Sequence, residues 1–101
     1  MSKTFRAEIT FTSTESGGYR NPQPGVRPQL VAGDILTTCI IWSNHSIESF
    51  HIGVPIEVVL ELPFWDEYRD KFHEGMEIIL CDGSRVIARG KFLDILVNGS
   101  S

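Results

Sequence analysis

The densest group of ionisable side chains in this sequence lies between positions 66 and 73. On a helical turn, Asp66, Asp70 and His73 would share one face, where they could ligate a metal ion or pair an acid with a base. Basic residues interleave with the acidic ones, and i, i+4 pairing on a solvated surface explains the group without chemistry. We therefore predict neither a metal site nor a catalytic site here, and a small metal-dependent enzyme stays a remote alternative. The group also contains Glu67, Arg69 and Lys71.

Three arginines form a second kind of candidate site, because they lie in or beside segments rich in turn residues. Guanidinium groups suit the bidentate recognition of carboxylates and phosphates, so Arg20, Arg27 and Arg85 are typical of a binding surface. The alternative is structural, since an arginine followed by Pro28 can tie a long loop to its domain through backbone carbonyls. Both interpretations remain open from the sequence alone.

Two aromatic side chains extend this candidate surface. Tyr19 directly precedes the first of the arginines, and Trp65 lies in a loop-like segment. Aromatic residues and arginine contribute most to the affinity of protein interfaces. Trp42, at the end of an apolar run, is expected in the core instead. The predicted partner-binding residues are Tyr19, Arg20, Arg27, Gln29, Trp65 and Arg85.

Several kinds of functional motif are missing from the sequence. It has no Gly-x-x-x-x-Gly-Lys-Ser/Thr loop, whose backbone amides and lysine would cradle a nucleotide phosphate. The serines lack a nucleophile-elbow context, and His45 and His51 have no cysteine or carboxylate at metal-ligand spacing. Cys39 and Cys81 lie in apolar runs, where we expect buried free thiols rather than a disulfide. We therefore predict no enzyme activity, no cofactor and no nucleotide.

The elements that must position these residues are almost all strands. Residues 5–12 and 56–62 carry an apolar side chain at every second position, which is the period of a half-buried strand. The side chains expected to face inward are Phe5, Ala7, Ile9, Phe11, Ile56, Val58, Leu60 and Leu62.

The other expected elements are shorter or joined by turns. Gly33-Asp34 forms a two-residue hairpin turn or a bulge, Asp82-Gly83-Ser84 is a turn, and Gly90 marks a bulge or sharp bend. Residues 66–73 offer the only plausible helix. About six strands with almost no helix favour a small barrel or sandwich. The remaining strand segments are 27–32, 35–42, 76–81 and 85–97, with a short strand at 49–53 and a long loop at 13–25.

Length and charge restrict the function further. The 101 residues fit one domain, over 1–101, and the net charge of -4 argues against an affinity based on phosphate neutralisation. The first residues lack the apolar region of a secretory signal, and no apolar run approaches the roughly 20 residues needed to cross a bilayer. We therefore expect a cytoplasmic protein without membrane contact.

Several short stretches follow one another in a recognisable order over nearly the whole chain. They are Phe5-Arg6-Ala7-Glu8, Gly17-Gly18, Arg27-Pro28-Gln29, Val59-Leu60-Glu61-Leu62-Pro63 and Asp82-Gly83-Ser84-Arg85. In this order they resemble the C-terminal, third domain of translation elongation factor Tu. Departures occur at Tyr19 and Arg20, where the family has arginine and histidine, and at 30–34, where the family has an aromatic and Arg-Thr-Thr-Asp run. Contacts that the family makes there are therefore not carried over.

The resemblance implies an all-β fold, namely a small six-stranded antiparallel β-barrel of Greek-key type. In the family this barrel packs against the GTPase domain and the second barrel and helps grip aminoacyl-tRNA. The resemblance thus implies a docking surface rather than a reaction. We expect a stand-alone binding or regulatory module that contacts a protein partner, and the alternative is binding of tRNA or another structured RNA by shape and phosphate contacts.

Overall fold

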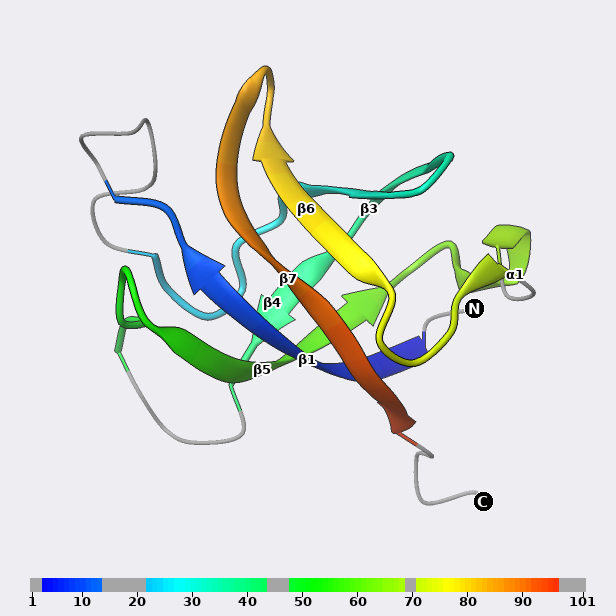
Figure 1. The fold of residues 1–101 in the computed structure, drawn as a ribbon, viewed down its shortest axis with the longest axis horizontal. Coiled ribbons are helices and arrows are strands. Elements are labelled where there is room, and N and C mark those ends of the chain that lie inside the picture. The colour runs from blue at the N-terminus through cyan, green and yellow to red at the C-terminus, as the bar shows by residue number, and fades with distance from the viewer. Residues whose placement is uncertain (1–2, 14–21, 44–47, 69–70, 97–101) are drawn as a thin grey trace.

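The computed structural model describes residues 3–13, 22–43, 48–68 and 71–96, which form seven strands and one short helix. The strands make a single antiparallel sheet in the order β3-β2-β6-β7-β1-β5-β4, and the fold is all-β (Figure 1). The elements are β1 (Lys3–Phe11), β2 (Gln29–Ala32), β3 (Ile35–Thr38), β4 (Ile40–Trp42), β5 (Pro55–Leu62), α1 (Trp65–Tyr68), β6 (Glu77–Asp82) and β7 (Arg85–Leu96).

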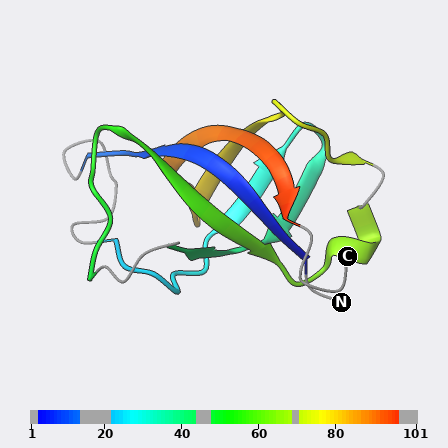
Figure 2. The same cartoon turned by 90° about the horizontal axis from the view of Figure 1, so that it is seen from below.

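The sheet curls into a half-barrel around one apolar core, and Figure 2 shows the strands curving about this common interior. The alternation predicted for β1 is confirmed, since its apolar side chains at 5, 7, 9 and 11 are no more than 1% exposed. In β5, Val58, Leu60 and Leu62 are buried in the same way, whereas Ile56 is half-buried. Burial of these side chains supplies the main driving force for folding.

Two glycines make the tight turns between neighbouring strands. Gly33, at φ +60°, joins β2 to β3 with Ala32 opposite Ile35, so the hairpin alternative is correct and the bulge alternative is not. Gly83, at φ +65°, joins β6 to β7 with Asp82 opposite Arg85, as expected. A positive φ at the first turn residue favours glycine in such two-residue connections.

Gly90 allows β7 to lie very close to β1, and it is not itself a bulge. A Cβ atom at this position would meet the Glu8 carbonyl oxygen and the Cα atom of Ile9. The register shifts of β7 lie on either side of it, opposite Leu80/Cys81 of β6 and opposite Arg6/Ala7 of β1. Glycine is needed here because two backbones approach each other.

Some predicted elements differ in extent from the observed ones. The expected strand 35–42 is divided at Cys39 into β3 and β4, which makes seven strands instead of six. The expected helix 66–73 is the four-residue α1, because the chain packs Phe72 into the core soon afterwards. The expected strand 49–53 contributes only an isolated bridge between Ile52 and Phe11.

Other predictions concern thiols and membrane contact. Cys39 is fully buried and free, whereas Cys81 is free but only half-buried, because it faces outward between the inward Leu80 and the turn. Within the described ranges, no helix has both the length and the apolar character that a bilayer span requires. Most of the predicted loop 13–25, His45 and Val97 lie outside the described residues.

Candidate functional site

The two edges of the sheet belong to one continuous run of the chain. β3 pairs with β2 at one edge, β4 pairs with β5 at the other, and only Cys39 separates them. The Cys39 amide donates to the Pro28 carbonyl at 3.0 Å, so the run keeps its contact with the β2 side as it passes from β3 to β4. Residues 35–42 face β5 and the segment that follows β5, and we call the line between them the seam.

The seam is closed along β4 and open along β3. Ile40, Ile41 and Trp42 lie opposite residues 61, 60 and 59 of β5. β5 ends at Leu62, and Pro63, which has no amide hydrogen to donate, begins the turn that leads into α1. Among the described strands, none therefore pairs with β3 on the seam side.

The backbone of β3 presents hydrogen-bonding groups to this open side. Ile41 donates to Val26 and Cys39 donates to Pro28, so the odd-numbered residues of the run face the β2 side. In an antiparallel ladder the intervening residues face the other way, which turns the amides and carbonyls of Leu36 and Thr38 towards the open seam. The Tyr68 hydroxyl donates to the Leu36 carbonyl at 3.3 Å from that side.

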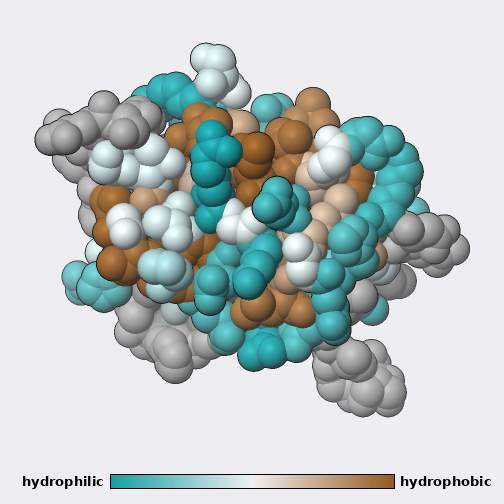
Figure 3. All heavy atoms as spheres, in the orientation of Figure 1, coloured by the Kyte–Doolittle hydropathy of each residue, from teal (hydrophilic) through white to brown (hydrophobic). Residues whose placement is uncertain are grey.

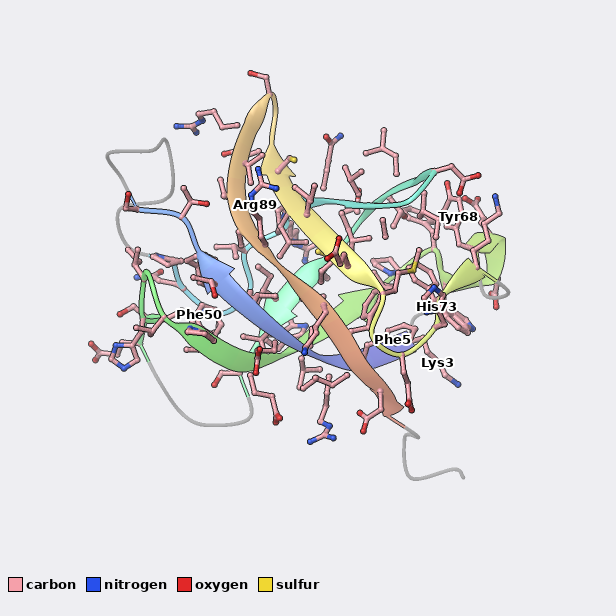
Figure 4. All side chains as sticks on the ribbon, viewed as in Figure 1. Lys3, Phe5, Phe50, Tyr68, His73 and Arg89 are labelled. Atoms are coloured by element: carbon pink, nitrogen blue, oxygen red, sulfur yellow. The ribbon has the colours of Figure 1, made fainter. Side chains whose placement is uncertain are left out.

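A groove of about 350 Å³ occupies the open seam between β3 and α1. Leu36 and Phe64 stand on its two sides and are 57% and 53% exposed, the highest values among the exposed large apolar side chains. Figure 4 places the labelled Tyr68 between α1 and the β2–β3 hairpin. The groove is lined by Leu36, Thr37, Thr38, Phe64, Glu67 and Tyr68.

An apolar strip continues from the groove across the outer face of the sheet. Leu36 lies opposite Val31, and Val31 lies opposite Ile79 on β6. Both β-branched side chains are half-buried and point away from the core. In Figure 3, hydrophobic atoms reach the surface over the part of the molecule where β6 and β3 lie. The strip ends at Arg89 on β7, which is opposite Ile79.

Carboxylates lie in and beside the groove. Asp34 lies in the turn next to β3, and Asp66 and Glu67 make the first turn of α1. Lys71 forms an ion pair with Asp34 at 3.4 Å, between side chains that are 53% and 82% exposed. Among the described residues that line the groove, the charged one is the acidic Glu67, which favours a negative potential there.

The predicted arginine surface lies elsewhere on the barrel. Arg27 and Gln29 are exposed just before and at the start of β2, and Gln29 is opposite Cys81 of β6. Arg85 follows the β6–β7 turn and forms an ion pair with Asp82 at 3.3 Å. These three residues come from neighbouring segments, but Tyr19 and Arg20 lie outside the described residues. The predicted surface therefore stays a prediction.

Trp65 does not join this surface. Its ring stacks on Phe72 at 5.7 Å between centroids and lies 5.1 Å from the Phe5 ring, and Lys3 lies over its face at 6.0 Å. Phe5 in turn contacts Phe92. Since Phe92 is seven residues along β7 from Arg85, Trp65 and Arg85 lie roughly 20 Å apart along the barrel. Figure 4 shows Lys3 and Phe5 at the end of the barrel near α1.

Trp42 was expected in the core, and the structure corrects this expectation. The side chain is 40% exposed because Ile41, its neighbour on β4, takes the inward position. Its indole nitrogen donates to the Glu61 carboxylate at 2.9 Å, and its ring lies 3.6 Å from the position of a Cβ atom at Gly25. Trp42 thus covers the closed half of the seam from outside.

The ionisable group at 66–73 is dispersed in the described structure. Asp66 lies in α1, whereas His73 is exposed on the connection to β6 with its Nδ1 atom 3.1 Å from the Glu74 carbonyl. Asp70 lies outside the described residues. Within the described part of the chain, no three His, Cys, Asp or Glu side chains are grouped as metal ligands would be.

An ion-pair network crosses β1 on the outer face. Arg6 contacts Asp94 through Nε at 2.8 Å and Nη2 at 2.6 Å, and it reaches Glu57 at 3.3 Å. The hydrogen bonds from Arg6 lower the pKa of Asp94, and this carboxylate raises the pKa of Arg6 in return. The network joins β1 to both of its neighbours and is typical of a structural role.

The residues at the groove were missed by the sequence analysis. The signal for Leu36 was the Gly33-Asp34 turn, because a two-residue hairpin fixes Ile35 inward and Leu36 outward. No comparable signal marked Phe64. Comparison of the sequence with protein-family models and with curated proteins found no match.

Proposed function

We propose that this chain is a protein-binding module, related to the C-terminal barrel of elongation factor Tu, that docks a partner at the groove between β3 and α1. The observation that carries the proposal is the pair Leu36 and Phe64. Two large apolar side chains, each more than half exposed, flank one groove. Exposed apolar groups that gather at a concave site favour a protein interface.

The apolar strip supports the same proposal. Val31 and Ile79 extend the exposed apolar surface from Leu36 over β2 and β6, so a partner could contact more than the groove alone. The acidic residues around it form a polar rim of the kind that surrounds protein interfaces. The carboxylate of Glu67 in the groove also favours a partner of opposite charge.

The positions of the family-like stretches agree with the proposed relationship. Phe5-Arg6-Ala7-Glu8 lies within β1, Arg27-Pro28-Gln29 leads into β2, and the Asp82–Arg85 stretch makes the β6–β7 turn. These are strand openings and turns of an antiparallel half-barrel. A binding role without a reaction is what the relationship implies.

The alternative, binding of a structured RNA, has less support. Arg85 pairs with Asp82, and this carboxylate competes with a phosphate for the guanidinium. Glu67, which lines the groove, would repel a phosphate backbone there. The net charge of -4 adds to this repulsion.

The test compares partner capture by matched variants of the full chain. Phe64→Ser removes one side of the groove, and Val54→Ser is the control because Val54 is 48% exposed before β5, away from the groove. Proteins retained from a cell extract are compared by quantitative mass spectrometry. We expect at least one protein to be retained at least tenfold less by Phe64→Ser and equally by Val54→Ser.

A different outcome would contradict the proposal. If the two variants and the unmodified chain retain the same proteins in equal amounts, the groove does not bind a protein partner. A labelled tRNA titrated at low salt tests the alternative in parallel. RNA binding that weakens with added salt and with Arg27→Gln would favour that alternative over the proposed function.

A further inference from the structure

We infer that the open half of the seam binds its partner by strand addition, as an extended, cationic segment that pairs with β3. This inference rests on the proposed protein-binding function and specifies its mode and the chemistry of the partner. The site is the backbone edge at Leu36 and Thr38, between β3 and α1.

The backbone of β3 supplies the recognition groups. Leu36 and Thr38 direct their amides and carbonyls into the groove, as the bonds of Cys39 and Ile41 to the opposite side require. An extended segment of three or four residues, rising about 3.3 Å per residue, spans these two positions. Main-chain hydrogen bonds to an exposed sheet edge then provide affinity that does not depend on the partner's sequence.

The closed half of the seam shows, within the same chain, the kind of strand pairing that we infer for β3. β5 occupies the equivalent place beside β4, where Ile40 lies opposite Glu61 and Ile41 opposite Leu60. Past Leu62 the chain turns away, and the groove of about 350 Å³ takes the place that a continuing strand would fill. An added strand would therefore extend the β4–β5 pairing along β3.

Leu36 and Phe64 indicate which side chains the segment carries. Successive residues of a strand point to opposite faces, so every second side chain of the segment faces the outer apolar surface next to Leu36. Aliphatic side chains at those positions would contact Leu36 and Phe64 and cover part of their exposed area. Such contacts add selectivity to the main-chain pairing.

The charges around the groove indicate the sign of the charge that the partner segment carries. Glu67 is the charged side chain among the described residues that line the groove, and Lys71 beside it is already engaged by Asp34. Lysine or arginine next to the aliphatic positions complements this rim, whereas acidic residues meet repulsion. A cationic, aliphatic segment in extended form is therefore the partner that the groove fits.

The experiment selects ligands from a random eight-residue peptide library on the full chain, with counter-selection on Phe64→Ser. We expect enriched peptides to alternate aliphatic residues with lysine or arginine. Nuclear magnetic resonance of the labelled chain should show the largest shifts at the amides of Leu36 and Thr38. Phe64→Ser should weaken the best peptide at least tenfold, and Val54→Ser should leave its affinity unchanged.

A second peptide separates strand addition from side-chain binding. The best peptide is resynthesised with methyl groups on alternate backbone nitrogens, in both possible phases. We expect one phase to weaken binding at least tenfold, because it removes the donors that face β3. If neither phase changes the affinity, or if acidic peptides are enriched, the inference is overturned while the protein-binding function stands.

Two further outcomes would also decide against the inference. If no peptide is enriched over the Phe64→Ser counter-selection, the edge does not add a strand, although a folded partner could still bind there. If the chain forms a dimer in sedimentation experiments and Phe64→Ser abolishes it, the occupant is a second copy of this chain. Loss of partner capture in the variant comparison, by contrast, would remove the proposed function itself.

Discussion

The run 35–42 has two halves that differ in whether a strand pairs with them at the seam. β4 is paired with β5, and Trp42 covers the pair from outside by donating to Glu61. β3, only one residue away, faces a groove, and the Tyr68 hydroxyl donates to the Leu36 carbonyl there. The difference arises in the segment opposite, because β5 ends at Leu62 and the chain then enters α1.

The half-barrel has an open edge at β3 without loss of the core. Inward residues of both halves are equally buried: Ile35 is 1% exposed and Ile41 is 0% exposed. Only the outward residues and the backbone edge differ. Unpaired edges are usually protected against uncontrolled association, often by charged side chains, and Asp34 and Glu67 lie beside the edge of β3.

Two alanine substitutions, one in each half, should differ strongly in their effect on stability. Leu60 is fully buried opposite Ile41 in the closed half. Leu60→Ala should therefore lower the free energy of unfolding by about 2–5 kcal/mol. Leu36→Ala in the open half should change it by about 0.5 kcal/mol or less, because the side chain is 57% exposed. Urea unfolding of both variants measures the difference. Equal losses would mean that Leu36 is part of the core and that the seam is closed.

Much of the fold could be predicted from local sequence patterns. The alternation in 5–12 indicated which side of β1 is buried, and Gly83 marked the β6–β7 turn, whereas Gly33 left a hairpin turn and a bulge as alternatives. These features depend on neighbouring residues only. The all-β class followed from them because almost no segment has a helical period.

The site could not be predicted in the same way. The division of 35–42 depends on which strands lie on either side, and that pairing joins residues about 20 positions apart. Trp42 follows the apolar pair Ile40 and Ile41, where no alternation indicates which residue faces inward. Phe64 is exposed because β5 stops before it, which is a property of the whole barrel.

The next effect tests the junction between the two halves, at Cys39. Burial raises the pKa of this thiol from 9.0 to about 12, so it stays neutral in the folded protein at a pH where the unfolded chain ionises. Its contribution is therefore fully present below about pH 9 and is lost as the pH rises towards 12. Both proteins carry Cys81→Ala, and one of them also carries Cys39→Ala. Between pH 8 and 10.5, the free energy of unfolding of the protein that keeps Cys39 should fall by about 2 kcal/mol relative to that of the Cys39→Ala variant. A constant difference would show that Cys39 is accessible to water and that the junction opens.

The smallest effect concerns Arg6, which holds β1 to β7 in the paired part of the barrel. Because hydrogen bonds from Arg6 lower the pKa of Asp94, their stabilisation is present above the usual carboxyl pKa of 3.8 and is lost as the pH falls through the lowered value. Arg6→Gln should therefore destabilise the protein at pH 7, by less than Leu60→Ala, and the loss should shrink in 1 M salt and in acid. Arg85→Gln is the matched control, since Arg85 makes one 3.3 Å contact within a single hairpin. If Arg85→Gln lowers the free energy of unfolding as much as Arg6→Gln does, the network across β1 stabilises the protein no more than an ordinary surface ion pair. The paired strands are then held by their backbone hydrogen bonds and the core alone.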